Sequence, residues 1–262
     1  MIATDFDRTL IGEDAILRPR TRAALRAASA AGLRVVVVTG RMFRSVRPYL
    51  LEAGLHDPVI CYQGAVVADP VSGEWLRHEP IPLELAKEAI AAVEAEGFPL
   101  NCYVDDELVV AEITDASRAY ADFQGLPITE VGDLLGWLEK PPTKLVAVEA
   151  PEVLDAFELR LKARFGDRLY ISKSLPYFLE LASPLVTKGS GLQFLAEHLG
   201  FSREDTIGFG DGENDVELLE WAGYGVAVAN AHKRVLAVAD LVCPSVAEEG
   251  VAQVVEACLE ER

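Results

Sequence analysis

The chain begins with two aspartates that flank a single aromatic residue, in the stretch DFDRTL. Asp5 and Asp7 stand two positions apart at the end of the first apolar run, and an extended backbone directs such side chains to the same side. Two carboxylates at one centre can divide nucleophilic attack and proton transfer between them. Asp and Thr are also ordinary turn residues, so DFDRTL taken alone favours a strand that ends in a polar turn.

Three further polar clusters occur where other predicted elements end or begin. They are Thr39-Gly40-Arg41 after an apolar run, Lys188 at a predicted helix start in VTKGSGL, and the group Asp211, Asn214 and Asp215 in GDGEND. In open parallel α/β sheets, ligands bind beyond the carboxyl ends of the strands. We therefore predict that these clusters meet Asp5 and Asp7 at one edge of a sheet, a joint placement that chance does not easily explain.

The elements that must position these clusters alternate between strand and helix at both ends of the chain. Continuous apolar runs between helices and glycine turns suit parallel strands that are covered on both faces. The fold class predicted is therefore α/β, a Rossmann-like parallel sheet with helices on both faces. Strands are predicted at 1–6, 33–38, 59–68, 206–209, 224–228 and 241–243, and helices at 19–31 and 42–53.

The middle of the chain has a different pattern. Two helical stripes, at 83–93 and 154–165, alternate with hairpin-like strand pairs. We predict an α+β cap domain at 80–183, inserted into a core domain formed by 1–79 and 184–262. Both stripes are expected to face the core of the insert.

Composition and charge exclude some classes of function. The 262 residues carry a formal net charge of -18, which argues against nucleic acid as a partner because phosphate backbones require clustered Lys and Arg. No apolar run has the length of a membrane span, so we expect no membrane partner and a cytoplasmic location. The cysteines at 61, 102, 243 and 258 are widely spaced, which predicts reduced structural thiols. No pattern sets an oligomeric state.

These stretches together resemble phosphatases of the haloacid dehalogenase superfamily, in the Cof-type branch with a large α/β cap. DFDRTL is similar to the family's DxDxT motif, VVVVTGR to its strand ending in Ser or Thr, Lys188 to its lysine motif, and GFGDGENDVELL to its acidic motif. VAVANA at 226–231 and EEGVA at 248–252 also fit, so the resemblance covers essentially the whole chain. It implies a Mg²⁺-dependent phosphatase of a small phosphorylated metabolite, a sugar phosphate, with an aspartyl-phosphate intermediate.

The resemblance also implies a role for each motif residue. Asp5 would attack the phosphorus, and Asp7 would protonate the leaving alcohol and then take a proton from water. Mg²⁺ would bind the carboxylates of Asp5 and Asp211 and the main-chain carbonyl of Asp7, with Asp215 behind these ligands. The phosphate-binding residues would be Phe6, Thr39, Gly40, Lys188 and Asn214, with the Phe6 side chain directed into the core.

Charge counting supports a cation at this site. Four aspartates and a phosphate dianion amount to about six negative charges, and each like pair near 4 Å costs about 4 kcal/mol at an effective dielectric of 20. Mg²⁺ suits such a cluster because it binds carboxylates, water and substrate phosphate oxygens.

Two positions depart from the family pattern. Arg8 replaces the usual glycine, and Gln63-Gly64-Ala65 replaces the frequent Asn-Gly-Ala. Arg8 and Arg41 are candidate substrate contacts. Arg8 directed inward, beside Asp7, could hold a second anionic group of the substrate, whereas Arg8 directed outward would be solvated or paired with a cap carboxylate. The outward orientation is favoured because exposed ion pairs contribute little.

Other functions remain as alternatives. A phosphomutase of the same superfamily shares the aspartyl-phosphate step, but such relatives generally carry a smaller, helical cap. A noncatalytic phosphometabolite sensor would be favoured by the loss of Asp5 or Asp7, and a signalling receiver lacks both DxDxT and the insert. Three residues near predicted cap turns could contact a leaving group, although solvent exposure is the favoured explanation for each: Asp105, Asp106 and Tyr177. The four histidines lack metal-ligand spacing and are expected at the surface.

Overall fold

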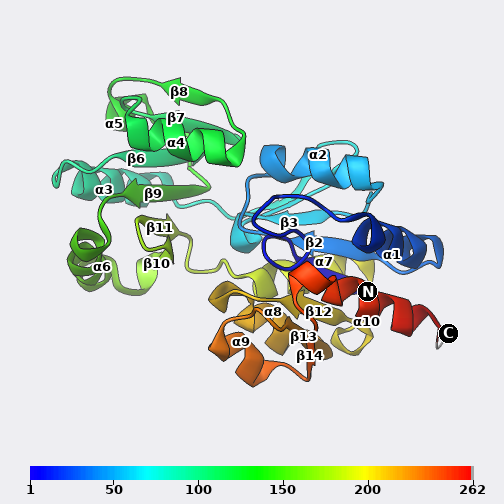
Figure 1. The fold of residues 1–262 in the computed structure, drawn as a ribbon. Helices are drawn as coiled ribbons and strands as arrows, with labels where there is room; N and C mark the ends of the chain where they lie inside the picture. The colour runs from blue at the N-terminus through cyan, green and yellow to red at the C-terminus, as the bar shows by residue number, and fades with distance from the viewer. Residues whose placement is uncertain (261–262) are drawn as a thin grey trace. The chain divides into compact units, whose positions relative to one another are not determined.

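The chain folds into two compact units, one of which is inserted into the other. The computed structural model describes residues 1–260, together with their side chains except those of 123–124 and 174–175. The core unit comprises 1–77 and 187–260, and the inserted unit comprises His78–Val186. The predicted boundaries, after 79 and before 184, lie within three residues of these. Figure 1 shows the strands and helices of both units.

The core unit is built on an eight-stranded sheet in the order β14-β13-β12-β1-β2-β3-β4-β5. Strands β14 to β3 in this order pair in parallel, and β3 and β4 pair antiparallel. The strands are β1 Ile2–Asp5, β2 Val35–Val38, β3 Val59–Cys61, β4 Val66–Ala68, β5 Trp75–His78, β12 Ile207–Gly210, β13 Tyr224–Val228 and β14 Leu241–Cys243. Every residue of β1 and β2 is buried, because both faces of the sheet are covered. The predicted fold class is confirmed.

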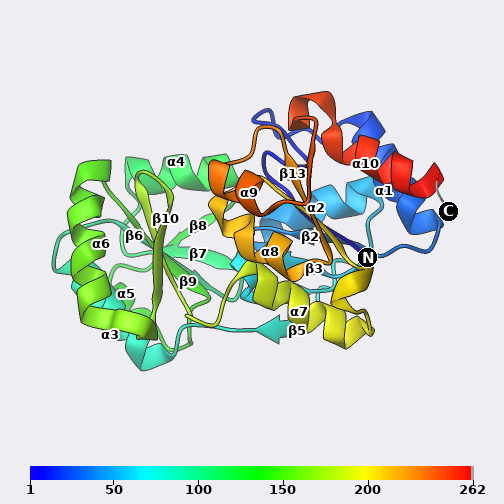
Figure 2. The same ribbon diagram turned by 90° about the horizontal axis from the view of Figure 1, so that it is seen from below.

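Helices cover both faces of this sheet (Figure 2). One layer contains α1 (Pro19–Ala30), α2 (Phe43–Ala53) and α10 (Gly250–Glu260), and the other contains α7 (Lys188–Leu199) and α8 (Val216–Trp221). Helix α9, Lys233–Val238, contributes Val235 to the same apolar cluster as α7 and α8. This cluster also includes Ala3, Val36, Val38, Ile60, Leu192, Leu195 and Leu218.

The inserted unit has a six-stranded sheet in the order β10-β11-β9-β6-β7-β8. These strands are β6 Leu100–Val104, β7 Glu107–Val110, β8 Ile128–Glu130, β9 Lys144–Val148, β10 Tyr170–Leu175 and β11 Phe178–Ala182. Helices α3 (Leu83–Glu94) and α6 (Pro151–Phe165) pack their apolar stripes on one face, as the sequence predicts. The shared core includes Ile90, Val93, Cys102, Leu145, Phe157, Leu161 and Leu181.

Four elements have no counterpart in the sequence-based prediction. They are β5, β8, α4 (Asp115–Gln124) and α5 (Leu134–Trp137). These elements are short or largely polar, so hydrophobic periodicity gives them little signal. The start of α4 is marked by a capping box between Thr114 and Ser117, a local signal that periodicity does not measure. Among the described residues, no helix has the length and apolar character needed to cross a membrane.

Candidate active site

Three of the four predicted polar clusters lie at the carboxyl ends of adjacent core strands, and the fourth, Lys188, begins helix α7. Asp5 is the last residue of β1, Thr39 follows β2, and Asp211 follows β12. Because these strands are parallel neighbours in the sheet, their carboxyl ends lie at one edge. This placement is what brings together residues that are far apart in the sequence.

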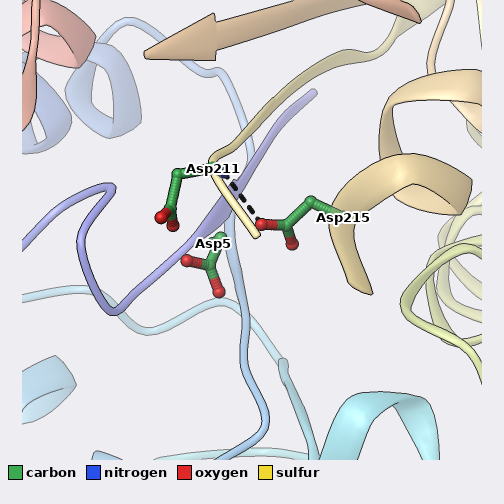
Figure 3. A group of neighbouring side chains, drawn as sticks. All are labelled: Asp5, Asp211 and Asp215. Carbon is green, nitrogen blue, oxygen red and sulfur yellow. Dashed lines mark hydrogen bonds between the residues drawn. The ribbon is translucent and has the colours of Figure 1, made fainter. Parts of the chain in front are cut away.

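Three buried carboxylates form the centre of this edge (Figure 3). Oxygen atoms of Asp5, Asp211 and Asp215 all lie within 4.8 Å of one another. None of the three residues is more than 4% exposed. Such a group of hard oxygen donors suits a divalent cation such as Mg²⁺.

Lys188 joins two of these carboxylates. Its Nζ donates to Oδ1 of Asp5 at 2.5 Å and to Oδ1 of Asp215 at 2.6 Å. Lys188 is the first residue of α7, whose start is fixed by a capping box between Thr187 and Ser190. Burial alone disfavours the charged amine, but Asp215 and Asp5 outweigh it and raise the pKa of Lys188. The side chain is therefore a permanent buried cation.

Asp215 is held on both of its oxygens. Its Oδ2 accepts the backbone N–H groups of Asp211 and Gly212, each at 2.9 Å, and its Oδ1 accepts the bond from Lys188. Figure 3 marks the bond from the Asp211 amide. With both oxygens occupied, Asp215 is suited to orienting the loop and Lys188.

Asp211 is more open to a ligand. Its Oδ1 accepts the Thr9 hydroxyl at 3.1 Å, and its Oδ2 lies 3.6 Å from Nε of Arg8. Burial raises the pKa of Asp211, and so does Asp215, while Arg8 and Thr9 oppose the change. Thr9 belongs to the DxDxT motif, which is the signal that could have identified it as a site residue.

The charge of this group is not balanced. Burial raises the pKa of Asp5 well above its ordinary value, Asp215 raises it further, and Lys188 only partly offsets them. Three buried carboxylates thus share one buried lysine, so the ionised cluster carries excess negative charge. The donor set and this excess both fit a divalent metal ion.

Asp7 lies outside the carboxylate group, because Arg41 binds it. Arg41 donates from Nε to one carboxylate oxygen at 2.9 Å and from Nη2 to the other at 2.6 Å. The guanidinium also lies over the rings of Phe6 and Tyr49, 5.2 and 5.6 Å from their centres. The structure therefore pairs Arg41, a candidate substrate contact, with Asp7. Phe6 is buried, as expected.

The remaining predicted phosphate residues lie at the neighbouring turn. Thr39 is fully buried, and its hydroxyl accepts the Arg41 N–H at 3.1 Å. Asn214 donates from Nδ2 to Oε1 of Gln63 at 2.8 Å, and the Gln63 amide lies beside Gly40. Gln63 thus belongs to this turn, although the sequence marked it only as a departure from the family pattern.

Arg8 matches neither predicted orientation completely. Its side chain is 60% exposed, but its Nε lies 3.6 Å from Oδ2 of Asp211, a buried carboxylate of the site, rather than beside Asp7 or a carboxylate of the insert. The backbone of Arg8 has φ of 62°, in the left-handed region that glycine adopts without strain. This conformation explains why glycine suits the position.

Residues outside the core site gave mixed outcomes. Asp105 and Tyr177 are exposed, but Asp106 is only 8% exposed, so solvent exposure does not explain it. Asp105 and Asp106 form the turn between β6 and β7 with φ of 52° and 60°, as a tight hairpin turn requires, and the turn leaves only Asp105 exposed.

The four histidines are exposed, and all four cysteines are free thiols. Burial raises the pKa of Cys102 to about 12, which makes it inert.

Comparison with known proteins agrees with this geometry. The chain matches the haloacid dehalogenase-like hydrolase family over residues 2–255. It is 29% identical over 258 residues to the 5-amino-6-(5-phospho-D-ribitylamino)uracil phosphatase YitU of Bacillus subtilis strain 168, covering 97% of this chain and 95% of YitU. A solved haloacid dehalogenase-like hydrolase from Bacteroides thetaiotaomicron has a TM-score of 0.91 and 28% identity over 98% of both chains. The subclass IIB sugar phosphatase BT4131 has a TM-score of 0.82 and 25% identity over 97% of both chains. The protein is therefore a phosphatase that belongs to the haloacid dehalogenase-like hydrolase family.

Proposed function

We propose that the protein is a Mg²⁺-dependent phosphatase of a small sugar phosphate and that it works through an aspartyl-phosphate at Asp5. The buried group of Asp5, Asp211 and Lys188 carries this proposal, because it places a nucleophile beside both an acidic cation site and a fixed ammonium. The family supports the substrate class, since BT4131 is a sugar phosphatase and the substrate named for YitU contains a phosphorylated ribityl chain. In this proposal the inserted unit selects the leaving group.

The first step forms the covalent intermediate. A carboxylate oxygen of Asp5 attacks the phosphorus, and the bond between the phosphorus and the leaving oxygen breaks. Lys188 occupies Oδ1 of Asp5, which leaves Oδ2 for the attack. Asp5, Asp211 and the Asp7 carbonyl would hold Mg²⁺, whose charge neutralises the oxygens of the phosphoryl group. Lys188 adds a second positive charge at the same centre.

Asp7 transfers the protons in both steps. It protonates the leaving oxygen, then takes a proton from the water that attacks the phosphorus. The bond from Asp5 to phosphorus breaks in this second step, and inorganic phosphate leaves. The two bonds from Arg41 fix the starting orientation of Asp7, so we assign Arg41 to positioning rather than to substrate contact. One of these bonds must open before Asp7 carries and transfers a proton, because Arg41 occupies both carboxylate oxygens.

The inserted unit argues against the phosphomutase alternative. Its six-stranded sheet differs from the smaller, helical cap that the family resemblance leads us to expect in mutases. A panel of phosphorylated sugars, nucleotides and glycolytic acids, assayed for free phosphate and for isomeric sugar phosphates, separates the two activities. If the protein isomerised a sugar phosphate without releasing inorganic phosphate, the assigned activity would be that of a phosphomutase instead of a phosphatase.

The direct test is Asp5→Asn, which removes the nucleophile and preserves side-chain volume. Hydrolysis of an aryl phosphate with Mg²⁺ should fall by about a thousandfold or more, since the covalent step is lost. Thermal unfolding should show that the fold is kept. Asp14→Asn is the matched control, because Asp14 is an exposed aspartate of the same unit that pairs with Arg18. Near-wild-type turnover in Asp5→Asn would exclude Asp5 as the nucleophile.

A further inference from the structure

The loop after β3 lies against the turn that carries Thr39 and Gly40. This loop, Tyr62–Gly64, is bonded to the turn that follows β2, since Tyr62 N–H donates to Arg41 O and Gln63 N–H donates to Thr39 O, both at 3.0 Å. On its other side the loop meets α7, because a Cβ on Gly64 would collide with the carbonyl oxygen of Thr187. The loop is therefore fixed between the turn at Thr39 and the helix that begins with Lys188.

The backbone of this loop is held in an unfavourable conformation. Tyr62 and Gln63 have φ of 52° and 60°, so two consecutive residues with side chains occupy the left-handed region. That region is costly for residues other than glycine, and such conformations cluster at functional sites. In this loop, the left-handed backbone accompanies a specific placement of the Gln63 side chain.

The Gln63 side chain connects two predicted phosphate-binding residues. Its Oε1 accepts Nδ2 of Asn214 at 2.8 Å. Its Nε2 lies 2.5 Å from the point that a Cβ on Gly40 would occupy, so a larger residue at position 40 would displace the Gln63 amide from this position. The amide of Gln63 thus spans the space between Gly40 and Asn214.

We infer that Gln63 is a positioning residue, which holds the Asn214 amide in the orientation that donates to the transferring phosphoryl group. An amide nitrogen carries two N–H groups, and Gln63 accepts one of them. The second N–H of Asn214 is then fixed in direction and available to a phosphoryl oxygen. This inference rests on the proposed function, and it assigns a role to the position where the chain departs from the family's asparagine.

The experiment compares Gln63→Ala, Asn214→Ala and the double variant in hydrolysis of an aryl phosphate with Mg²⁺. Gln63→Ala should lower kcat/KM by about ten- to a hundredfold, mainly in kcat, because a donor to the transition state loses its orientation. The double variant should be no slower than Asn214→Ala alone, since Gln63 acts through Asn214. Losses that multiply in the double variant would overturn this assignment.

A second variant separates positioning from stability. Gln63→Gly relieves the left-handed backbone, so its thermal midpoint should equal or exceed that of the wild type while kcat falls as in Gln63→Ala. A variant that loses activity only in proportion to lost folded protein would refute the inference. Gln193→Ala is the control, because the exposed Gln193 bonds only to Glu197 on the surface of α7.

The two levels of the proposal can fail separately. The proposed function would be overturned if the wild-type protein did not hydrolyse phosphomonoesters, or if its hydrolysis did not require Asp5. Wild-type hydrolysis that requires Asp5 but is unaffected by Gln63→Ala would overturn only the role of Gln63. Competitive inhibition by inorganic phosphate gives an independent measure, and it should weaken in Gln63→Ala because Asn214 then binds the product less well.

Discussion

Each of the two units buries a lysine against carboxylate, but the two lysines have different surroundings. Lys188 in the core unit bonds to both Asp5 and Asp215, and Asp211 lies in the same group. In the inserted unit, Glu180 is the one carboxylate that the Lys144 ammonium meets among the described residues, at 3.3 Å, and the ammonium lies 5.0 Å from the ring centre of Tyr103. Both lysines are at most 5% exposed.

The difference lies in the balance of charge. Lys144 and Glu180 form a one-to-one pair, and Glu180 outweighs the effect of burial and raises the pKa of Lys144. In the core unit, three carboxylates share the buried Lys188 and the largely exposed Arg8, and the pKa of Asp5 is raised in spite of Lys188. A balanced pair can be purely structural, whereas an unbalanced group is relieved by protonation of a carboxylate or by a further cation. Excess negative charge, rather than burial of charge, therefore distinguishes the core unit from the inserted one.

The largest expected difference is in activity. Lys188→Met should reduce kcat by about a thousandfold or more, because the cation that orients Asp5 and neutralises the phosphoryl group is lost. Lys144→Met, the same change at the balanced pair, should keep kcat within about threefold when corrected for folded protein. The measurement is aryl phosphate hydrolysis at saturating substrate and Mg²⁺. Comparable losses in the two variants would remove the distinction between the pairs.

The next effect concerns stability in the inserted unit. Lys144→Met leaves Glu180, whose side chain is only 12% exposed, without its ammonium partner and should cost about 3 kcal/mol of unfolding free energy, the lower end of the loss expected for breaking a buried pair. The double change Lys144→Met with Glu180→Leu should recover most of this loss, because it removes both charges. Denaturant titration of the three proteins tests this. If the double variant is as unstable as the single one, packing rather than charge explains the effect.

A smaller effect is expected from pH and metal. Because the folded protein raises the pKa of Asp5 above its ordinary 3.8, metal-free protein should lose stability as pH rises from about that value through the raised pKa. Mg²⁺ should offset this loss, stabilising by about 2.7 kcal/mol at a concentration one hundred times its Kd. Chelation followed by thermal unfolding across pH, with and without Mg²⁺, measures both effects. Asp211→Ala should abolish the stabilisation by Mg²⁺, and its persistence there would contradict the metal assignment.

The smallest effect is expected at Arg8. Arg8→Gly removes an ion pair whose arginine is 60% exposed and screened by solvent, worth about 1 kcal/mol, and relieves a left-handed backbone that costs a similar amount or more. The unfolding free energy should therefore rise slightly or stay unchanged, and kcat/KM for sugar phosphates should change less than threefold. If kcat/KM fell only for substrates that carry a second anionic group, Arg8 would instead be assigned to binding that group.

The sequence by itself determined the class of fold and which polar residues follow the strands of the sheet. Alternating buried strands and helices specify a parallel sheet, because a strand covered on both faces needs a continuous apolar run. The polar residues after β1, β2 and β12 then fall at one edge by topology alone, so the shared placement of Asp5, Thr39 and Asp211 followed from the sequence. The inserted α+β unit was visible because its two long helices have clear apolar stripes.

Only the tertiary structure decided which of these side chains pair. Lys188 and Asp5 are 183 positions apart, and Asn214 and Gln63 are 151 apart, so no local pattern encodes their bonds. The same reason explains why the bonds of Arg41 to Asp7 were not predicted. Local patterns record the backbone conformation and burial of a segment, whereas side-chain partners depend on strand order and on close approaches such as that of Gly40. Those approaches exist only once the sheet has formed.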